Sequence, residues 1–262
     1  MRSLLSVSIL GLLSCASVQA AQLDTKQWFN GLSYTNVDVA HGSNLDVYAF
    51  ATQYYLEAQD SSGVWDDYGY IDTDSNFYAF GYDAPGSDAL GFGGEYFFNQ
   101  FFVTAEVQDV DNFDNHSIGL GYLVSDNLKL SIRNQAIDNG SDVQWFKAEY
   151  LHYLNDTDYL GFNANIDDEF DAWSVSARYL KNIEADSYFT LDAEYLDNDG
   201  DGVFSAMADY YFTRNFALGA GVNDSDLQLE AKYFFNSSYY LTAHYLDRDN
   251  AEMFNLEFVA QF

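Results

Sequence analysis

Apolar and polar residues alternate with a period of two along most of the chain after residue 20. Leu227, Leu229 and Tyr233, for example, alternate with polar residues such as Gln228 and Glu230. Because successive residues of a β-strand point to opposite faces, this pattern predicts strands with one apolar and one polar face. The same alternation recurs in segments 189–195, 241–245 and 254–262.

Two kinds of turn separate these segments, and they alternate along the chain. The first kind is short and flanked by aromatic residues, as in 97–102, 122–128, 212–216 and 234–240. The second kind is rich in Asp, Asn and Gly, as in 138–142, 167–169 and 197–202. Asn-Gly and Asp-Gly pairs are strong signals for β-hairpins. The chain is therefore expected to be a continuous series of antiparallel hairpins.

Sixteen strands are predicted, an even number that returns both ends of the chain to the same side. The third is overlong, and we expect a bulge or bend in it near Asp72 and Asp74. The predicted strands are 27–38, 44–56, 65–83, 88–98, 101–110, 115–124, 128–137, 143–154, 158–167, 170–180, 187–197, 202–212, 215–222, 226–235, 239–248 and 251–262.

A closed barrel in a membrane is the architecture that suits so many two-faced strands. No helical pattern is available to cover a sheet face, and no apolar stretch is long enough for a transmembrane helix. A barrel leaves no sheet edge, and its apolar face meets lipid. We expect an all-β, closed antiparallel transmembrane β-barrel of about 16 strands with short turns on both sides. The aromatics beside the short turns would form a girdle at one membrane interface, although strand propensity also explains aromatic residues.

The first 20 residues have the features of a cleaved secretory signal peptide. Arg2 is followed by an apolar stretch and by the small-residue site that ends at Ala20. Residues 21–262 would then be a single outer-membrane barrel domain. A lipoprotein signal ending at Cys15 is the alternative, but the bulky Leu13 fits that motif imperfectly. Because Cys15 is the chain's only cysteine, the mature protein would have no disulfide.

The charge composition of the chain limits the kinds of molecule that it can bind. The chain has 41 acidic and 10 basic residues and a formal charge of −31. This excess of acid argues against nucleic acid as a partner, because phosphates require Lys and Arg. High acidity can also indicate disorder, but 18% of the residues are aromatic and 48% are hydrophobic. In a barrel the acids would line the lumen and the turns, while the aromatics face lipid.

The C-terminus carries a second indication of an outer-membrane barrel. The last residue is Phe262, and Phe258 and Leu256 share its face of the last strand. This ending resembles the assembly signal that the barrel-assembly machinery reads in bacterial outer-membrane proteins. It would place the aromatic-flanked turns in the periplasm and the Asp/Asn/Gly turns outside the cell.

One stretch resembles the general bacterial porin family of Gram-negative bacteria. It runs from Tyr54 through Trp65-Asp66-Asp67-Tyr68-Gly69-Tyr70-Ile71-Asp72 to Ser75-Asn76. The resemblance implies a diffusion channel in the outer membrane and a homotrimer. Longer porins fold a long loop into the pore, and the sequence predicts no comparable loop here.

Alternation predicts which charged residues line the lumen. A basic strip facing an acidic wall would create a transverse field, whereas local ion pairs would neutralise these charges in place. Because acidic groups in a pore favour cations, we expect a weak cation preference. The basic candidates are Lys129, Arg133, Lys147, Arg178 and Lys232, and the acidic candidates are Glu95, Glu106, Glu149, Asp192, Glu194, Glu230 and Glu257.

Other chemistry is weakly indicated. The motif that begins at Asp197 resembles a calcium loop, but its twelfth position is Ala208 instead of Glu, so a hairpin turn is the simpler interpretation. The four histidines match no metal-binding motif, and no Ser-His arrangement is marked as catalytic. We therefore expect no cofactor, no metal and no enzymatic activity. Acidic turns could still attract divalent cations at the lipopolysaccharide surface.

The sequence thus predicts a porin that lets small hydrophilic solutes and ions diffuse through the outer membrane. Its partners would be outer-membrane lipid, lipopolysaccharide, the barrel-assembly machinery and small polar solutes. Two alternatives stay open: a structural or adhesive barrel without an open channel, and a lipid-active barrel enzyme.

Overall fold

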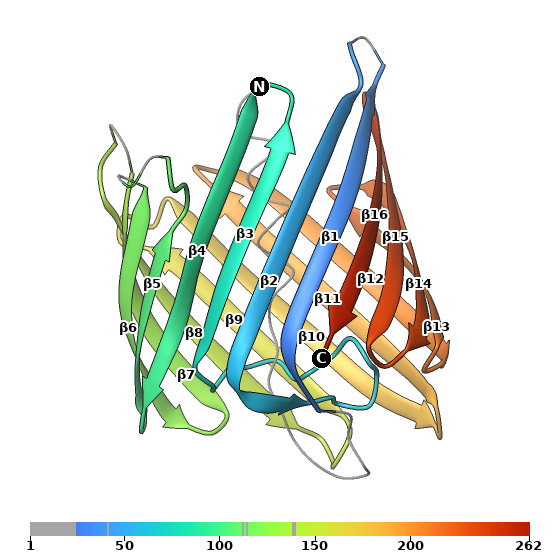
Figure 1. Ribbon diagram of the computed structural model, residues 1–262, viewed down its shortest axis with the longest axis horizontal. Coiled ribbons are helices and arrows are strands. Elements are labelled where there is room, and N and C mark those ends of the chain that lie inside the picture. Colours follow the sequence, from blue (N-terminus) through green and yellow to red (C-terminus); the bar gives the residue numbers. More distant parts are fainter. Residues whose placement is uncertain (1–24, 41, 112, 114, 138–139) are drawn as a thin grey trace.

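A computed structural model describes residues 25–262 except 41, 112, 114 and 138–139. Its strands form one closed antiparallel barrel in which each strand pairs with its neighbours in sequence and β1 pairs with β16 (Figure 1). The predicted fold class and the number of strands are confirmed. The expected signal peptide, residues 1–20, lies outside the described residues.

The strands tilt across the barrel wall and most are 8 to 13 residues long. They are β1 (Thr25–Val39), β2 (Leu45–Asp60), β3 (Asn76–Ala84), β4 (Ser87–Phe98), β5 (Phe101–Val107), β6 (His116–Ser125), β7 (Leu128–Ala136), β8 (Val143–Tyr153), β9 (Tyr159–Asp167), β10 (Ala172–Glu184), β11 (Ser187–Asn198), β12 (Asp201–Thr213), β13 (Phe216–Asn223), β14 (Asp226–Asn236), β15 (Tyr239–Arg248) and β16 (Ala251–Gln261).

Hairpin connections between consecutive strands lie at both ends of the barrel. We call the end where β1 begins and β16 ends the terminal end, and the opposite one the far end. Two-residue hairpin turns occur at both ends. In the β11–β12 turn, Asp199 and Gly200 have φ values of 55° and 86°. Two successive positive φ angles are typical of type I′ turns, which match the twist of the flanking strands.

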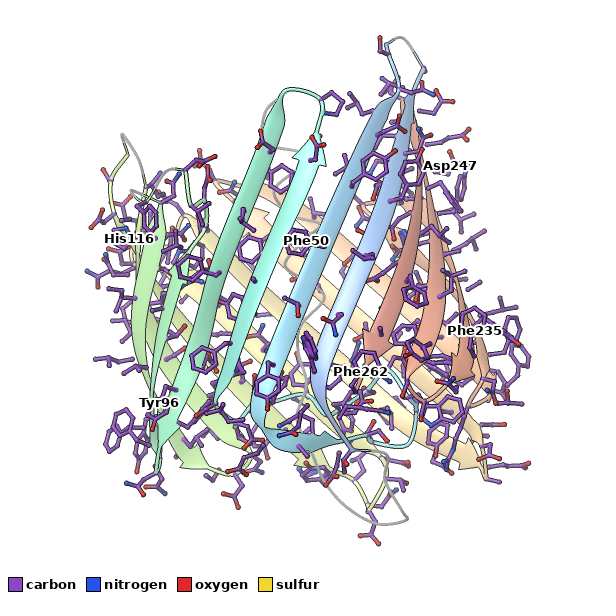
Figure 2. All side chains as sticks on the ribbon, in the orientation of Figure 1. Phe50, Tyr96, His116, Phe235, Asp247 and Phe262 are labelled. Atoms are coloured by element: carbon purple, nitrogen blue, oxygen red, sulfur yellow. The ribbon has the colours of Figure 1, made fainter. Side chains whose placement is uncertain are left out.

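The outer surface is apolar, as the alternation predicts. Leu227, Leu229, Tyr233 and Phe235 all point outward, with 43–57% of each side chain's surface exposed. Figure 2 shows Tyr96, Phe235 and Phe262 toward the terminal end, and His116 and Asp247 toward the far end. None of the described segments is a helix long and apolar enough to cross a membrane.

The third strand is the main correction to the sequence-based expectation. The predicted strand 65–83 is wrong, because β3 begins only at Asn76. Residues 61–75 instead form the β2–β3 connection at the terminal end, which we call the inserted loop. Val64, Tyr68 and Ile71 in this loop are at most 1% exposed. The expectation that no long loop folds into the barrel is therefore also wrong.

Candidate functional site: the barrel lumen and the inserted loop

The inserted loop lies inside the barrel. Its residues contact side chains of β1, β7, β9, β10, β12, β14 and β16. These strands belong to opposite parts of a closed wall, so only a loop within the lumen can reach all of them. The loop turns at Gly69, whose φ of 98° is accessible to glycine at little cost.

Asp66 anchors the loop to one side of the wall. Its Oδ2 accepts hydrogen bonds from the Tyr211 hydroxyl at 2.8 Å and from Lys232 Nζ at 3.0 Å. Lys232 also lies 3.1 Å from Glu230 and 3.7 Å from Asp209. One ammonium group therefore faces three carboxylates, which leaves this part of the lumen negative.

Asp67 anchors the loop to β9 and β10. Its Oδ2 accepts from the Tyr159 hydroxyl at 2.6 Å and from Arg178 Nη1 at 3.2 Å. Its Oδ1 accepts from Ser62 Oγ at 2.6 Å and from the Gly69 amide at 3.0 Å. Both oxygens of this buried carboxylate therefore have two hydrogen-bond donors each. Asp67 therefore both shapes the loop and attaches it to the wall.

Lys129 of β7 makes the third polar anchor. Its Nζ donates to the Asp72 carbonyl at 3.0 Å and to Glu95 Oε2 at 2.7 Å. The Asp72 carboxylate accepts from Asn76 Nδ2 and from the Asp74 amide. Burial raises the pKa of Asp72 to about 8, although the Lys129 charge acts in the opposite direction.

Apolar packing completes the attachment of the loop. The Tyr68 ring lies 4.8 Å from that of Phe29 in an edge-on arrangement. Tyr70 lies against Gly161 of β9, where a Cβ would collide with its ring. The carbonyl of Trp65 accepts from Gln261 Nε2 at 2.6 Å. The loop is therefore held on several sides by both polar and apolar contacts.

The strand register places all twelve predicted lumen residues on the inner face of the sheet. Four basic residues have acidic partners nearby: Lys129 with Glu95, Lys147 with Glu149, Arg178 with Asp192 and Lys232 with Glu230, at 2.6 to 3.1 Å. Glu106 accepts from the Tyr78 hydroxyl. Arg133, Glu194 and Glu257 share the inner face by register. The arrangement corresponds to local pairing, not to a basic strip separated from an acidic wall.

Several lumen residues were missed by sequence reasoning. The alternation assigns Asp66 and Asp67 to a strand, and no sequence pattern marks the tyrosines that bind them as site residues. One signal was available: two adjacent aspartates in a spanning strand would force one charge toward lipid, which is costly. That conflict points to a loop, but it does not tell which strands the loop contacts.

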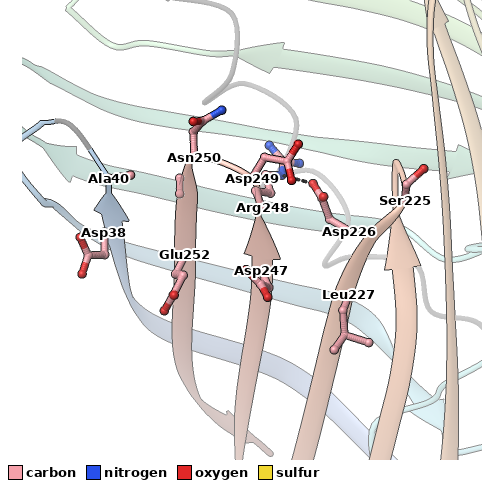
Figure 3. A pocket seen from close by; sticks show the side chains of 11 residues that line it. Asp38, Ala40, Ser225, Asp226, Leu227, Asp247, Arg248, Asp249, Asn250 and Glu252 are labelled. Atoms are coloured by element: carbon pink, nitrogen blue, oxygen red, sulfur yellow. Dashed lines mark ion pairs between the residues drawn. The ribbon is translucent and has the colours of Figure 1, made fainter.

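The far end of the barrel is acidic. Figure 3 shows a hollow there, bordered by Asp38, Asp226, Asp247, Asp249 and Glu252 around Arg248. Arg248 lies 3.7 Å from Asp226 and donates to Asn223. Within the described part of the chain, no group of three or more His, Cys, Asp or Glu side chains is arranged to hold a metal ion.

The segment that resembles a calcium loop is a hairpin turn. The Asp197 carboxylate accepts from the Gly200 amide at 3.2 Å, and Asp201 already begins β12. An aspartate side chain commonly accepts a hydrogen bond from a backbone amide of its own turn, as Asp197 does here.

Comparisons with known proteins agree with this architecture. The whole chain, residues 1–262, matches the family described as "Putative general bacterial porin". None of the curated proteins compared with the chain is detectably similar in sequence.

Solved structures share the fold at low sequence identity. The outer membrane protein Omp33 of Acinetobacter baumannii is 12% identical with a TM-score of 0.60, and the match covers 91% of this chain and 99% of that one. A triple mutant of the Rhodopseudomonas blastica porin is 11% identical with a TM-score of 0.54, covering 90% and 99%. Both comparisons support the barrel fold.

Proposed function

The chain belongs to the general bacterial porin family, whose barrel fold points to the bacterial outer membrane, and from this we propose that it forms a narrow, water-filled channel. Small hydrophilic solutes and ions would cross it by passive diffusion. The observation that carries the proposal is a closed sixteen-strand barrel with charged side chains on its inner face. A barrel of this size is wide enough to leave an aqueous passage.

The inserted loop would set the width of this passage. It occupies part of the lumen at the terminal end and is attached at Asp66, Asp67 and Asp72. Solutes would pass between the loop and the uncovered part of the wall. We therefore propose a channel with a lower conductance than an unobstructed barrel of the same size.

The charge of the lumen supports our proposal of a weak cation preference. Each of the anchoring groups Lys129, Arg178 and Lys232 has at least two acidic neighbours. The positive charges are therefore compensated, and further carboxylates such as Glu194 and Glu257 remain on the inner face. Acidic groups along a pore attract cations and repel anions.

Planar-bilayer recordings test both parts of this proposal. We expect discrete conductance steps with the purified protein and, in a KCl gradient, a reversal potential on the cation side. Clear anion selectivity would contradict the charge argument. Folded protein that inserts into the bilayer but produces no steps would contradict the channel itself.

A structural barrel with a blocked lumen is the second candidate, and the inserted loop is the observation that favours it. Solute-exclusion measurements separate the two, because a blocked barrel admits neither ions nor small sugars. We propose no enzymatic role, and a lipase assay on the purified protein checks the lipid-active alternative.

Export and assembly complete the proposal. Residues 1–20 would be removed on export, and Phe262, Phe258 and Leu256 would present the assembly signal. In this orientation the terminal end, where the inserted loop enters the lumen, would face the periplasm, and the acidic far end would lie outside, near lipopolysaccharide. A homotrimer would follow from the family resemblance, and native mass spectrometry in detergent measures it.

A further inference from the structure

Three aromatic side chains form a column on the inner face of β3. Tyr78, Phe80 and Tyr82 occupy alternate positions of this strand, and each is partly exposed. Their register places them on the same face as Glu106, inside the barrel. Among the sixteen strands of the described chain, only β3 has aromatic residues at three successive inward positions. We call these three residues the aromatic strip.

The rings at the base of the strip lie against the wall. Phe80 and Tyr78 pair with Gly91 and Gly93 of β4, and a Cβ on either glycine would collide with the facing ring. The centroids of these two rings are 6.3 Å apart, and their planes differ by only 27°. Both rings therefore cover the β4 backbone, and both residues stay partly exposed on the inner face of the sheet.

Polar groups border the strip. The Tyr78 hydroxyl donates to Glu106 Oε2 at 2.7 Å, and the Tyr82 hydroxyl is 3.1 Å from Ser87 Oγ. The aromatic rings of the strip therefore lie beside one carboxylate and several hydroxyl groups. Sites for small molecules commonly have this composition, an apolar surface with a few polar groups that fix orientation.

We propose that the aromatic strip binds linear neutral oligosaccharides as they move through the lumen. A pyranose ring presents C–H groups on its face and hydroxyls at its edge. The C–H groups carry partial positive charge and suit the negative face of an aromatic ring, while the hydroxyls can bond with Glu106, Tyr82 and Ser87. This inference rests on the proposed channel, through which the oligosaccharide would pass, and it specifies one class of solute for that channel.

The regular spacing of the three aromatic residues favours a sugar chain over a single cation as the ligand. Alternate residues of a strand are about 6.8 Å apart, so the rings offer similar contacts at regular intervals. A cation needs only one ring face and gains little from a column. A chain of sugar units can shift from one ring to the next while it keeps its contacts.

A purely structural role is the competing explanation. Aromatic rings can cover glycine in a neighbouring strand and so protect its backbone from water. Leucine would preserve much of this apolar cover but has no aromatic face. Phe80→Leu and Tyr82→Leu therefore separate the two roles. Phe77→Leu is the matched control, because Phe77 lies on the same strand with its side chain outside and 55% exposed.

The test is block of single-channel current by maltotriose added from the far end. We expect concentration-dependent block, with a half-blocking concentration about three- to tenfold higher in F80L and in Y82L. Phe80→Trp, which retains a ring face, should preserve the block, and F77L should match the unaltered protein. Any block of the current by a polyethylene glycol of similar size should be the same in F80L, in Y82L and in the unaltered protein.

Calorimetry in a detergent without a sugar headgroup measures binding independently of conduction. Maltotriose binding that F80L and Y82L weaken supports the strip, even if no conductance steps are seen and the channel proposal itself fails. Conductance steps without any maltotriose binding overturn the strip and leave the channel intact. Binding that the leucine variants do not change also overturns the strip.

Discussion

At the residue scale, Asp67 both organises the inserted loop and attaches it to the wall. It is 3% exposed and joins Ser62 and Gly69 of the loop to Tyr159 and Arg178 of the wall. Its removal would leave the Tyr159 hydroxyl and part of the Arg178 guanidinium without their acceptor. Charged hydrogen bonds of this type stabilise by about 1.5–3 kcal/mol each.

We predict that Asp67→Asn loosens the loop and raises single-channel conductance and current noise. The loss of about 1.5–3 kcal/mol corresponds to roughly a 10- to 150-fold change in the ratio of attached to detached loop. Asp186→Asn is the matched control, because Asp186 also pairs with an arginine, Arg214 at 3.0 Å, but is 66% exposed. Equal recordings from both variants would contradict the anchoring role.

The raised pKa of Asp72 predicts how attachment of the inserted loop depends on pH. Burial raises the pKa of Asp72 to about 8, Glu95 and Asp74 raise it further, and Lys129 lowers it. A raised pKa means that the attached loop favours the protonated acid. Attachment is therefore strongest below the ordinary pKa of about 4 and weakens as pH rises toward 8.

We expect conductance to increase between pH 5 and about 8 in the unaltered protein. Asp72→Asn, which stays neutral, should show a flatter pH profile with the loop attached throughout. Bilayer recordings in a series of buffers measure this. If the pH dependence persists unchanged in Asp72→Asn, then groups other than Asp72 cause it.

At the element scale, the inserted loop is separable from the wall that surrounds it. The wall is held by antiparallel pairing of every strand with two neighbours, and none of those pairings runs through residues 61–75. The loop adds contacts inside the barrel, such as Tyr70 against Gly161. A shorter connection between β2 and β3 should therefore leave a closed barrel.

We predict that replacing residues 62–74 with a flexible Gly/Ser linker of about six residues, long enough to return along the end of β2, raises conductance about twofold or more, because the lumen is cleared. Shortening of the connection between β5 and β6 is the control and should change conductance less, because this connection follows the far end of β5. Unchanged conductance in a correctly folded loop variant would show that the loop does not limit the passage.

At the scale of the whole molecule, closure between the first and last strands makes the sheet a barrel. Asn30 of β1 pairs directly with Ala260 of β16, and Gln27 and Trp28 donate to the Phe262 carbonyl. Pairing at this seam leaves no exposed sheet edge in the membrane.

A disulfide at the seam tests this closure. Paired residues of an antiparallel ladder have Cα atoms about 4.5–5.5 Å apart, within the range that a disulfide spans. The double variant Asn30→Cys and Ala260→Cys should form an intramolecular bond in the folded protein, seen as a mobility shift on a non-reducing gel. Asn30→Cys with Val175→Cys, on β10 across the barrel, should not form one.

The number of strands, the position of most turns and the apolar outer face are predictable from the sequence. These features depend on neighbours in sequence: alternation places Leu229 outside, and Asp199-Gly200 makes its turn locally. The conformation of residues 61–75, in contrast, depends on contacts that form only in the folded barrel. Local alternation around Tyr68 and Tyr70 fits a strand, whereas Asp67 binds Tyr159, 92 residues away. Such a contact exists only once the barrel has brought distant strands around the loop.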